Sequence, residues 1–211
     1  MSNTRKWRKL ALRAIALPLL AGTILVGTPA QAQFSDSFRF LEAVRKKEGA
    51  KVEEFLNQPG STIINARDVS SGRAALHVVT ERRDLTWLRY LIGKGANVNV
   101  RDNRGVTPLQ LATNLGWIEG VQALVAANAD LEQSNDTGET PLISAVHRRN
   151  TALMQILLKG GANPDRTDNS GRSARDYAML EGKNSQLVST IETHAQPGGK
   201  NKAQTTYGPV F

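Results

Sequence analysis

The sequence predicts an all-α solenoid, in which short helix pairs stack side by side and are joined by hairpin loops. Four glycines recur at intervals of 33 residues without drift: Gly72, Gly105, Gly138 and Gly171. Three apolar columns keep the same step: Leu76, Leu109 and Leu142; Ala112, Ala145 and Ala178; and Leu91, Leu124 and Leu157. A fixed period of this length indicates similar units that cannot bury their own apolar faces and become stable only by stacking.

Residues 1–32 have the three parts of a secretory signal, so we expect them to lie outside the fold. Five basic residues precede or flank the start of an uncharged apolar run at 14–26, and Ala30-Gln31-Ala32 matches a small-x-small cleavage site. Cleavage there would make Gln33 the first residue of the mature chain. Because the apolar run is shorter than the about 20 residues that a membrane-spanning helix needs, an uncleaved inner-membrane anchor is the alternative.

Residues 33–64 are predicted to form a pair of capping helices at the N-terminal end of the solenoid. Phe40, Leu41 and Val44 supply an apolar stripe before Gly49, and the segment 52–56 supplies a second stripe after it. Such spacing is typical of two short amphipathic helices. We interpret this segment as a degenerate repeat that closes one end of the stack.

The unit 99–131 illustrates how one period begins. The segment 101–105, with the sequence RDNRG, is rich in turn formers, and Gly105 can adopt the left-handed conformation that a tight turn needs. Thr107 and Pro108 then open a helix, because a Thr side chain caps free backbone N–H groups and Pro is tolerated at the first helical position. Gly116 is expected to end this first helix.

The second half of the same unit predicts a second helix and a second turn. Val121, Leu124 and Val125 form the i, i+3, i+4 stripe of an amphipathic helix. Asn128 follows, in the position that Gly95 and Gly161 hold in the neighbouring units. Since Asn tolerates the left-handed conformation better than most residues, the exchange supports the alignment of the units.

A turn, a helix, a short loop and a second helix within 33 residues resemble the ankyrin repeat, whose pattern has T-P-L-H-x-A at the first helix. The segments 107–112 (TPLQLA) and 140–145 (TPLISA) match this pattern except for the His. The segment 74–77 (AALH) keeps the Leu and the His, and 95–99 (GANVN) is similar to the family's G-A-D-V-N loop. The resemblance covers residues 65–195, as units 65–98, 99–131, 132–164 and 165–195, of which the outer two are degenerate.

The resemblance implies a non-catalytic protein-binding scaffold, in which a partner docks on the hairpin tips and on the concave face of the first helices. Three of the four tips carry Arg, which suits bidentate contacts with carboxylates and favours an acidic partner protein. For any one of these residues, a solvated loop side chain is the alternative. The candidate partner-binding residues are Arg67, Arg73, Arg101, Arg104, Asp136, Glu139, Arg166 and Arg172.

Other polar residues are interpreted as structural. The Asp and Asn residues at 68, 102, 135 and 168 are expected to bond the backbone of their own turns. His77 stands at the family's T-P-L-H position, where the resemblance implies that the imidazole ties the hairpin loop. His147 is interpreted as the solvated end of a first helix, and Trp87 and Trp117 as packing residues between repeats rather than as anchors for a partner.

The composition excludes several classes of function. The chain has no Cys, which excludes disulfides, thiolate metal sites and a lipid-anchored lipoprotein. Five of the 27 Lys and Arg residues lie in the leader and none of the 19 Asp and Glu residues do, so the remainder carries a formal charge of +3 and predicts no nucleic-acid partner. No nucleophile elbow, phosphate-binding Gly loop or paired carboxylates are present, so we predict neither enzymatic activity nor a cofactor.

The leader, the lack of Cys and the repeat array together favour a periplasmic protein of a Gram-negative bacterium, with secretion as the alternative. We expect no stable membrane span after cleavage of the leader. A second function remains open, in which the Arg-bearing tips bind anionic lipid or a cell-wall polymer at the envelope surface. Residues 196–211 are predicted to be a flexible tail, with a docking peptide at 207–211 (YGPVF) as the alternative.

The first full repeat predicts a weak helix start. Ala74 and Ala75 replace the Thr-Pro of the next two units, and a lost N-cap costs about 1 kcal/mol. We therefore expect amide hydrogens at this helix start to exchange faster than those after Thr107 and Thr140. The double substitution Ala74→Thr/Ala75→Pro should raise the melting temperature, whereas equal exchange protection at all three starts would contradict the interpretation.

Overall fold

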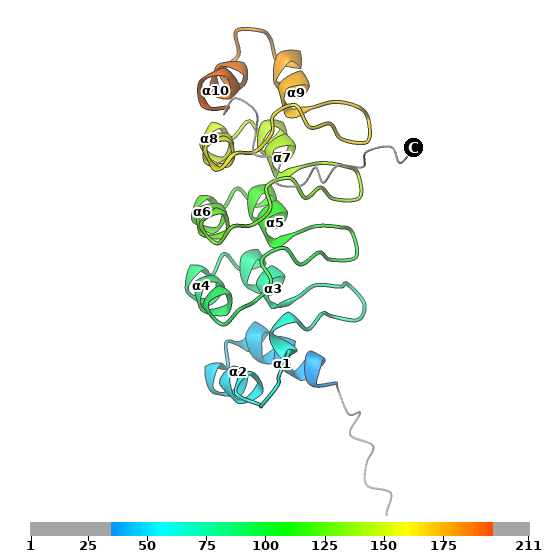
Figure 1. Ribbon diagram of the computed structural model, residues 1–211, viewed down its shortest axis with the longest axis vertical. Helices are drawn as coiled ribbons and strands as arrows, with labels where there is room; N and C mark the ends of the chain where they lie inside the picture. The colour runs from blue at the N-terminus through cyan, green and yellow to red at the C-terminus, as the bar shows by residue number, and fades with distance from the viewer. Residues whose placement is uncertain (1–34, 196–211) are drawn as a thin grey trace, which may run out of the picture. The chain divides into compact units, whose positions relative to one another are not determined.

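The computed structural model describes residues 35–195, which form ten α-helices and one short 3₁₀ helix (Figure 1). Their bounds are α1 Asp36–Lys46, α2 Gly49–Leu56, η1 Ile63–Asn65, α3 Ala75–Glu81, α4 Leu85–Gly93, α5 Pro108–Asn114, α6 Ile118–Ala126, α7 Pro141–His147, α8 Thr151–Gly160, α9 Ala174–Leu180 and α10 Gln186–His194. The predicted leader and the predicted tail lie outside the described residues.

The helices form five pairs, which we number as layers 1 to 5 from α1–α2 to α9–α10 (Figure 1). The first helices pack on one another in chain order, α1 on α3, α3 on α5, α5 on α7 and α7 on α9. The second helices do the same from α4 to α10. Extended pairing in residues 35–195 is limited to two isolated bridges, so the all-α solenoid predicted from the sequence is confirmed.

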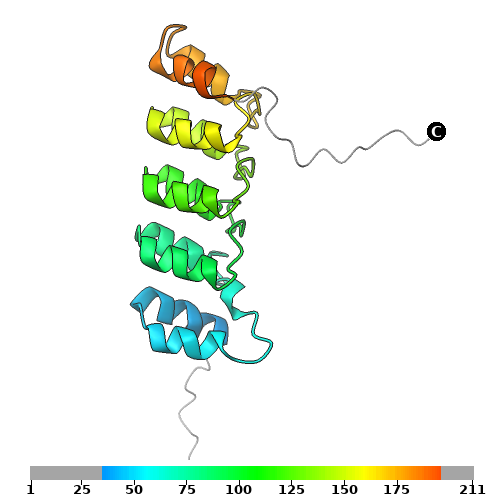
Figure 2. The ribbon, with the colours of Figure 1, turned by 60° about the vertical axis from the view of Figure 1, so that its left-hand side comes forward.

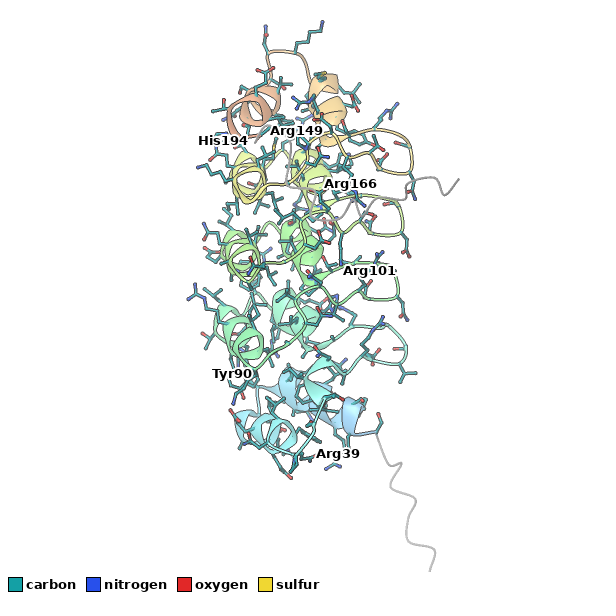
Figure 3. All side chains as sticks on the ribbon, viewed as in Figure 1. Arg39, Tyr90, Arg101, Arg149, Arg166 and His194 are labelled. Atoms are coloured by element: carbon teal, nitrogen blue, oxygen red, sulfur yellow. The ribbon has the colours of Figure 1, made fainter. Side chains whose placement is uncertain are left out.

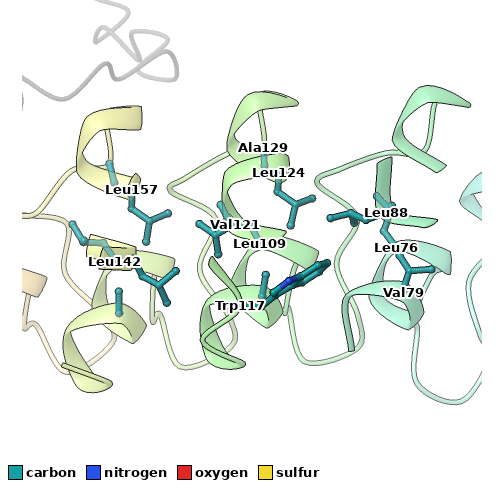
Figure 4. Close-up of a cluster of buried hydrophobic side chains, with 14 of the residues drawn as sticks. Leu76, Val79, Leu88, Leu109, Trp117, Val121, Leu124, Ala129, Leu142 and Leu157 are labelled. Atoms are coloured by element: carbon teal, nitrogen blue, oxygen red, sulfur yellow. The ribbon is translucent and has the colours of Figure 1, made fainter. Parts of the chain in front are cut away.

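The apolar columns of the sequence form the core between the layers (Figure 4). Leu76, Leu109 and Leu142 are all buried, one in each successive first helix. The second helices contribute the buried column Leu88, Val121, Met154 and Leu187 and the buried column Leu91, Leu124 and Leu157. Within residues 35–195 all members of this core lie between residues 40 and 191, so the segment 34–211 retains every one of them.

Repeated turns hold the layers at a constant spacing along the chain. The four glycines that define the period all have positive φ, between 69° at Gly72 and 80° at Gly171. Asn128 has φ of 58° in the position where Gly95 and Gly161 have 88° and 100°, which confirms the interpretation of that exchange. In layer 1 the two helices lie on either side of the turn at residues 47–48, where Lys47 has the left-handed conformation with φ of 59°, and Gly49 is the first residue of α2.

Trp117 confirms the expectation that it packs inside the protein. Its side chain is buried in the core beneath the start of α6 (Figure 4). A Cβ atom at Gly120 would lie only 2.1 Å from the indole ring, so the helix needs Gly at that position. Trp87 is half-buried and meets the ring of Tyr90 edge-on, with 5.5 Å between the ring centroids.

A column of side chains also bonds the chain segment before a layer to the segment after it, in layers 2, 3 and 4. The Oδ1 atom of Asn65 accepts the N–H of Asn97 at 2.8 Å, and Oδ1 of Asn99 accepts the N–H of Asp130 at 2.8 Å. In the third place, Oε1 of Glu132 accepts the N–H of Asn163 at 2.7 Å. In this layer a carboxyl group therefore stands where an amide oxygen accepts the bond in the other two. Burial raises the pKa of the Glu132 carboxyl above its usual value, because it disfavours the ionised form.

We expect Glu132→Gln to stabilise the protein at neutral pH. The raised pKa means that the folded state disfavours the ionised carboxylate, so stability falls as the pH rises through the folded pKa. The amide oxygen of Gln can accept the same N–H without the charge. The midpoint of urea unfolding should therefore rise at pH 7, and the gain should vanish below pH 4, where wild-type Glu132 is protonated in both states. A gain of equal size at both pH values would contradict this reading.

Candidate partner-binding surface

The long loops between layers are closed by one acceptor side chain each, which confirms the structural interpretation of that column. Oδ1 of Asp102 accepts the backbone N–H groups of Arg104 and Val106, both at 2.9 Å. Asp68, Asn135 and Asp168 make the equivalent bonds in the other loops. The hydroxyls of Ser70 and Ser170 and backbone N–H groups hold the pKa of the Asp68 and Asp168 carboxyls well below the usual range.

Neighbouring loop tips are bonded into a ladder. The N–H of Asn103 donates to the carbonyl of Ser71 at 3.0 Å, and the N–H of Asp136 donates to that of Arg104 at 3.1 Å. The N–H of Asn169 donates to the carbonyl of Thr137 at 3.1 Å. The tips therefore form a continuous edge rather than separate fingers, seen beside the first helices in Figure 1.

Three of the predicted arginines contribute to the architecture of this edge. Nε of Arg67 donates to the carbonyl of Gly72 at 2.9 Å within its own loop. Nη2 of Arg101 donates to the carbonyl of Ser134 at 2.9 Å and so joins two layers. Arg73 makes an ion pair with Glu81 at 3.0 Å, which connects the loop to the end of α3. These residues lie where we predicted, but part of each guanidinium group is already used inside the protein.

The other predicted arginines offer their charges more freely. Arg104 is exposed, and its guanidinium group has no hydrogen bond or ion pair within residues 35–195. Arg166 is also exposed and lies on the side of the long loops, as does Arg101 (Figure 3). The Arg172 guanidinium carbon lies 6.0 Å from the centre of the Tyr177 ring, within range of a cation–π contact.

The surface between the loops and the first helices presents a different pair of side chains in each layer. Arg73 pairs with Glu81 in layer 2, and Glu139 contacts His147 at 3.1 Å in layer 4. Both pairs join positions eight residues apart, but the acid and the base have exchanged places. We call the long loops together with these loop-facing positions of the first helices the tip face.

A polar network crosses the tip face from layer 3 to layer 5. The side-chain amide of Gln110 donates to the hydroxyl of Ser144, which donates to Oε1 of Glu139 at 2.8 Å. The imidazole of His147, which also bonds Glu139, packs edge-on against Tyr177, with 4.4 Å between ring centroids. His147 is the exposed last residue of α7, as interpreted, but its contacts with Glu139 and Tyr177 were not predicted. The eight-residue spacing that it shares with the Arg73 pair was the available signal.

His77 confirms its expected role in tying the loops. Nδ1 accepts the N–H of Ala74 at 3.1 Å, and Nε2 lies 2.9 Å from the carbonyl of Val106 in the next loop. This arrangement requires the neutral tautomer with a proton on Nε2. Burial lowers the pKa of the imidazole, in agreement with a neutral ring. The bond to Ala74 satisfies a backbone donor but leaves the helix start without a side-chain N-cap.

Within residues 35–195, no three His, Asp or Glu side chains lie where they could share a metal ion. Several carboxylates of the tip face accept bonds from neighbouring side chains, as the contacts of Glu139 with Ser144 and of Asp168 with Tyr177 illustrate. None of the described helices is long and apolar enough to cross a membrane.

Comparison with known proteins identifies the family. Two family models match, one described as ankyrin repeats (3 copies) at residues 40–135 and one as ankyrin repeats (many copies) at residues 124–178. Together these matches cover more than half of the chain, and the periodic helix pairs agree with them. The chain belongs to the ankyrin repeat family.

Several animal proteins are similar to this chain. Human ankyrin repeat domain-containing protein 63 is 31% identical over 151 residues, which are 68% of this chain and 40% of the relative. The mouse B-cell lymphoma 3 protein homolog is 31% identical over 135 residues, which are 62% of this chain and 30% of the relative. Mouse neurogenic locus notch homolog protein 1 is 27% identical over 164 residues, covering 77% of this chain and 6% of the relative. The chain thus spans less than half the length of these relatives.

The tip ladder predicts a reciprocal pair of stability changes. The side-chain amides of Asn103 and Asn169 donate to the carbonyls 33 residues earlier, Ser70 and Asp136, both at 2.9 Å. Asp136 occupies the same position but has no amide donor. We expect Asp136→Asn to add the missing bond and Asn169→Asp to remove one, each worth about 1 kcal/mol. For a protein of this size that is a shift in melting temperature of roughly 2–4 °C.

Calorimetry on the two variants and on the double variant measures both effects. Opposite shifts would support the ladder, and the double variant should melt close to wild type. The reverse pair of shifts, with a lower melting temperature for Asp136→Asn and a higher one for Asn169→Asp, would mean that the change of charge beside the tip arginines, and not the amide bond, decides the outcome.

Proposed function

We propose that this protein is an exported, non-catalytic scaffold that binds a partner protein through its tip face. Ankyrin repeats generally mediate protein–protein interaction, which gives the class of function. The observation that carries the assignment to this face is the contrast between its two kinds of column. The core columns repeat nearly the same side chain in every layer, whereas the loop-facing columns change chemistry from layer to layer.

The residue types in the loop-facing columns change from one layer to the next. The loop position is Arg73, then Val106, Glu139 and Arg172, and the helix position is Glu81, then Asn114, His147 and Leu180. A stack that only needed solubility could repeat one polar residue. A surface with a different pair in each layer suits a partner of one defined sequence and orientation.

The charges favour a partner with acidic groups opposite layers 3 and 5. Arg104, Arg166 and Arg172 are exposed, and Arg is well suited to bidentate contacts with carboxylates. Layer 4 instead presents Asp136 and Glu139, so a basic group of the partner is expected there. This mixed pattern favours a protein over a uniformly anionic polymer on the tip face.

The cellular setting of the proposal rests on the sequence. The predicted leader and the absence of Cys support export to a periplasm, with secretion as the alternative, and we propose no enzymatic activity. Envelope lipid or cell-wall polymer as ligands of the tip arginines is the second function. It has weaker support, because Arg67, Arg73 and Arg101 are partly occupied within the protein.

Site-specific crosslinking tests the proposal. A photoreactive amino acid replaces Arg104 or Tyr177 on the tip face, or Gln122 on the exposed side of α6 as the control, in cells that express the full chain. We expect the two tip-face positions to capture the same protein and the α6 position to capture none of it. Capture of that protein equally well from Gln122 would contradict the assignment to the tip face.

A matched pair of charge reversals tests the electrostatic part. Arg104→Glu changes an exposed tip residue and Arg89→Glu changes an exposed residue of the outer helix α4 by the same charge. We expect the first to reduce crosslinking from Tyr177 and the second to leave it unchanged. If both variants crosslink as well as wild type, Arg104 does not contribute to binding through carboxylates of the partner.

A further inference from the structure

The turns that join the two helices of each layer form a second edge, at the other end of the helices from the long loops (Figure 2). These five turns comprise residues 47–48, 82–84, 115–117, 148–150 and 181–185. They contain six of the Lys and Arg residues and three of the Asp and Glu residues. We call this the turn edge.

At the turn edge, basic residues occupy positions whose left-handed backbone conformation favours glycine. Residues 83, 116, 149 and 182 are equivalent and all have positive φ, of 55°, 67°, 52° and 112°. Gly occupies this position in layers 3 and 5, whereas layers 2 and 4 have Arg83 and Arg149. Lys47 takes the same conformation in layer 1, with φ of 59°. A side chain with a Cβ is disfavoured here, so the fold alone does not call for a basic residue.

The acids of the turn edge are neutralised, and the cations reach outward. Asp84 is largely buried and contacts Lys47 at 2.7 Å, while Glu181 contacts Arg149 at 2.6 Å and Glu48 contacts Lys51 at 2.9 Å. The side chains of Lys47 and Arg149 remain 56% and 69% exposed in these pairs. Arg83 donates to the carbonyl of Leu115 at 2.6 Å, which presents its guanidinium group at the same edge.

Further exposed cations add to this charge. Arg148 and Lys183 are exposed in their turns and have no side-chain ion pair within residues 35–195. Arg45 and Lys46, in the last turn of α1, contact Glu42 at 3.4 and 3.2 Å on the surface. Residues 35–195 as a whole carry nearly equal numbers of acids and bases, so the turn edge is where positive charge is concentrated.

We propose that the turn edge docks on an anionic membrane surface. Basic residues near such a surface each favour binding, and a row of short turns offers them along one line rather than in a pocket. Two exposed apolar side chains lie beside this row at the end of α9, Leu180 at 70% and Met179 at 45% exposure. Exposed apolar groups among cations suit a lipid interface, where the apolar group enters the headgroup region and the cations meet lipid phosphates.

The turn edge gives the molecule a second role, apart from that of the tip arginines. Its basic residues include none of the predicted tip residues, and the long loops lie at the other end of the helices (Figure 2). Leu180, the last residue of α9, is the one position that the turn edge shares with the loop-facing column of the first helices. The protein would hold a partner protein on one side while its other side lies on the membrane. The anionic-lipid function that the tip arginines suggested is thereby moved to a different set of residues.

The repeats themselves supply the variant that tests the proposal. Lys47→Gly/Arg83→Gly/Arg149→Gly removes three cations and installs the residue that layers 3 and 5 already use in that conformation. Arg101→Gln/Arg104→Gln/Arg166→Gln removes the same charge from the tip face as the control. Both are made in the segment 34–211, which retains every core residue of the described part of the chain, and melting temperatures verify that wild type and each variant are folded in this segment.

Sedimentation with vesicles of equal parts phosphatidylcholine and phosphatidylglycerol measures binding. We expect the turn variant to bind at least about tenfold more weakly than wild type, the tip variant within about threefold, and wild type to be released by high salt. Equal losses in the two variants, or no loss in the turn variant, would overturn the proposal. Binding of wild type to polyglutamate but not to the vesicles would overturn it in favour of an acidic protein. Tip-face crosslinking in the turn variant reports separately on the proposed function.

Discussion

The structure depends on the burial of each layer's apolar face by the next layer. A single helix pair such as α5–α6 exposes Leu109, Val121 and Leu124 unless neighbours cover them. Because of the 33-residue period, equivalent side chains face one another at every interface. The same packing arrangement is therefore repeated along the whole stack. The interlayer bonds of Asn65, Asn99 and Glu132 and the ladder of tips then fix the register between layers.

Much of this architecture could be predicted because its causes are local. Gly72 and its equivalents mark left-handed turns, Thr107 and Thr140 mark helix starts, and the leucine columns mark the core. The exchange of Gly for Asn128 was also readable, since the same backbone conformation limits the choice of residue. Each of these features follows from a few neighbouring residues, and repetition of the pattern reinforces it.

The features that sequence reasoning missed depend on side chains that reach across layers or along a helix. The contact between Glu139 and His147 spans α7, and the contact of His147 with Tyr177 joins two repeats. Arg83 and Arg149 occupy a glycine position without any signal in composition, because a basic residue at a helix end is normally read as a solvated one. Both features lie on the surface, where packing between layers does not fix the residue type and the 33-residue period therefore gives no signal.

The scaffold therefore separates two tasks. Its interior columns are nearly uniform and supply stability, while the tip face and the turn edge vary from layer to layer at little expense to packing. The network from Gln110 to Tyr177 orders the tip face before any partner arrives, which reduces the entropy that binding must overcome. In the turn edge, Arg148 and Lys183 are exposed and have no side-chain ion pair within residues 35–195, so these two charges remain available.

Native-state hydrogen exchange of the segment 34–211 tests the central claim most directly, because it reads stability layer by layer. If each layer is stable only through its neighbours, protection should be greater in α3, α5 and α7, which are covered on both sides, than in α1 and α9 at the two ends of the stack. Uniform protection in all five layers, or a maximum in either terminal layer, would contradict the account.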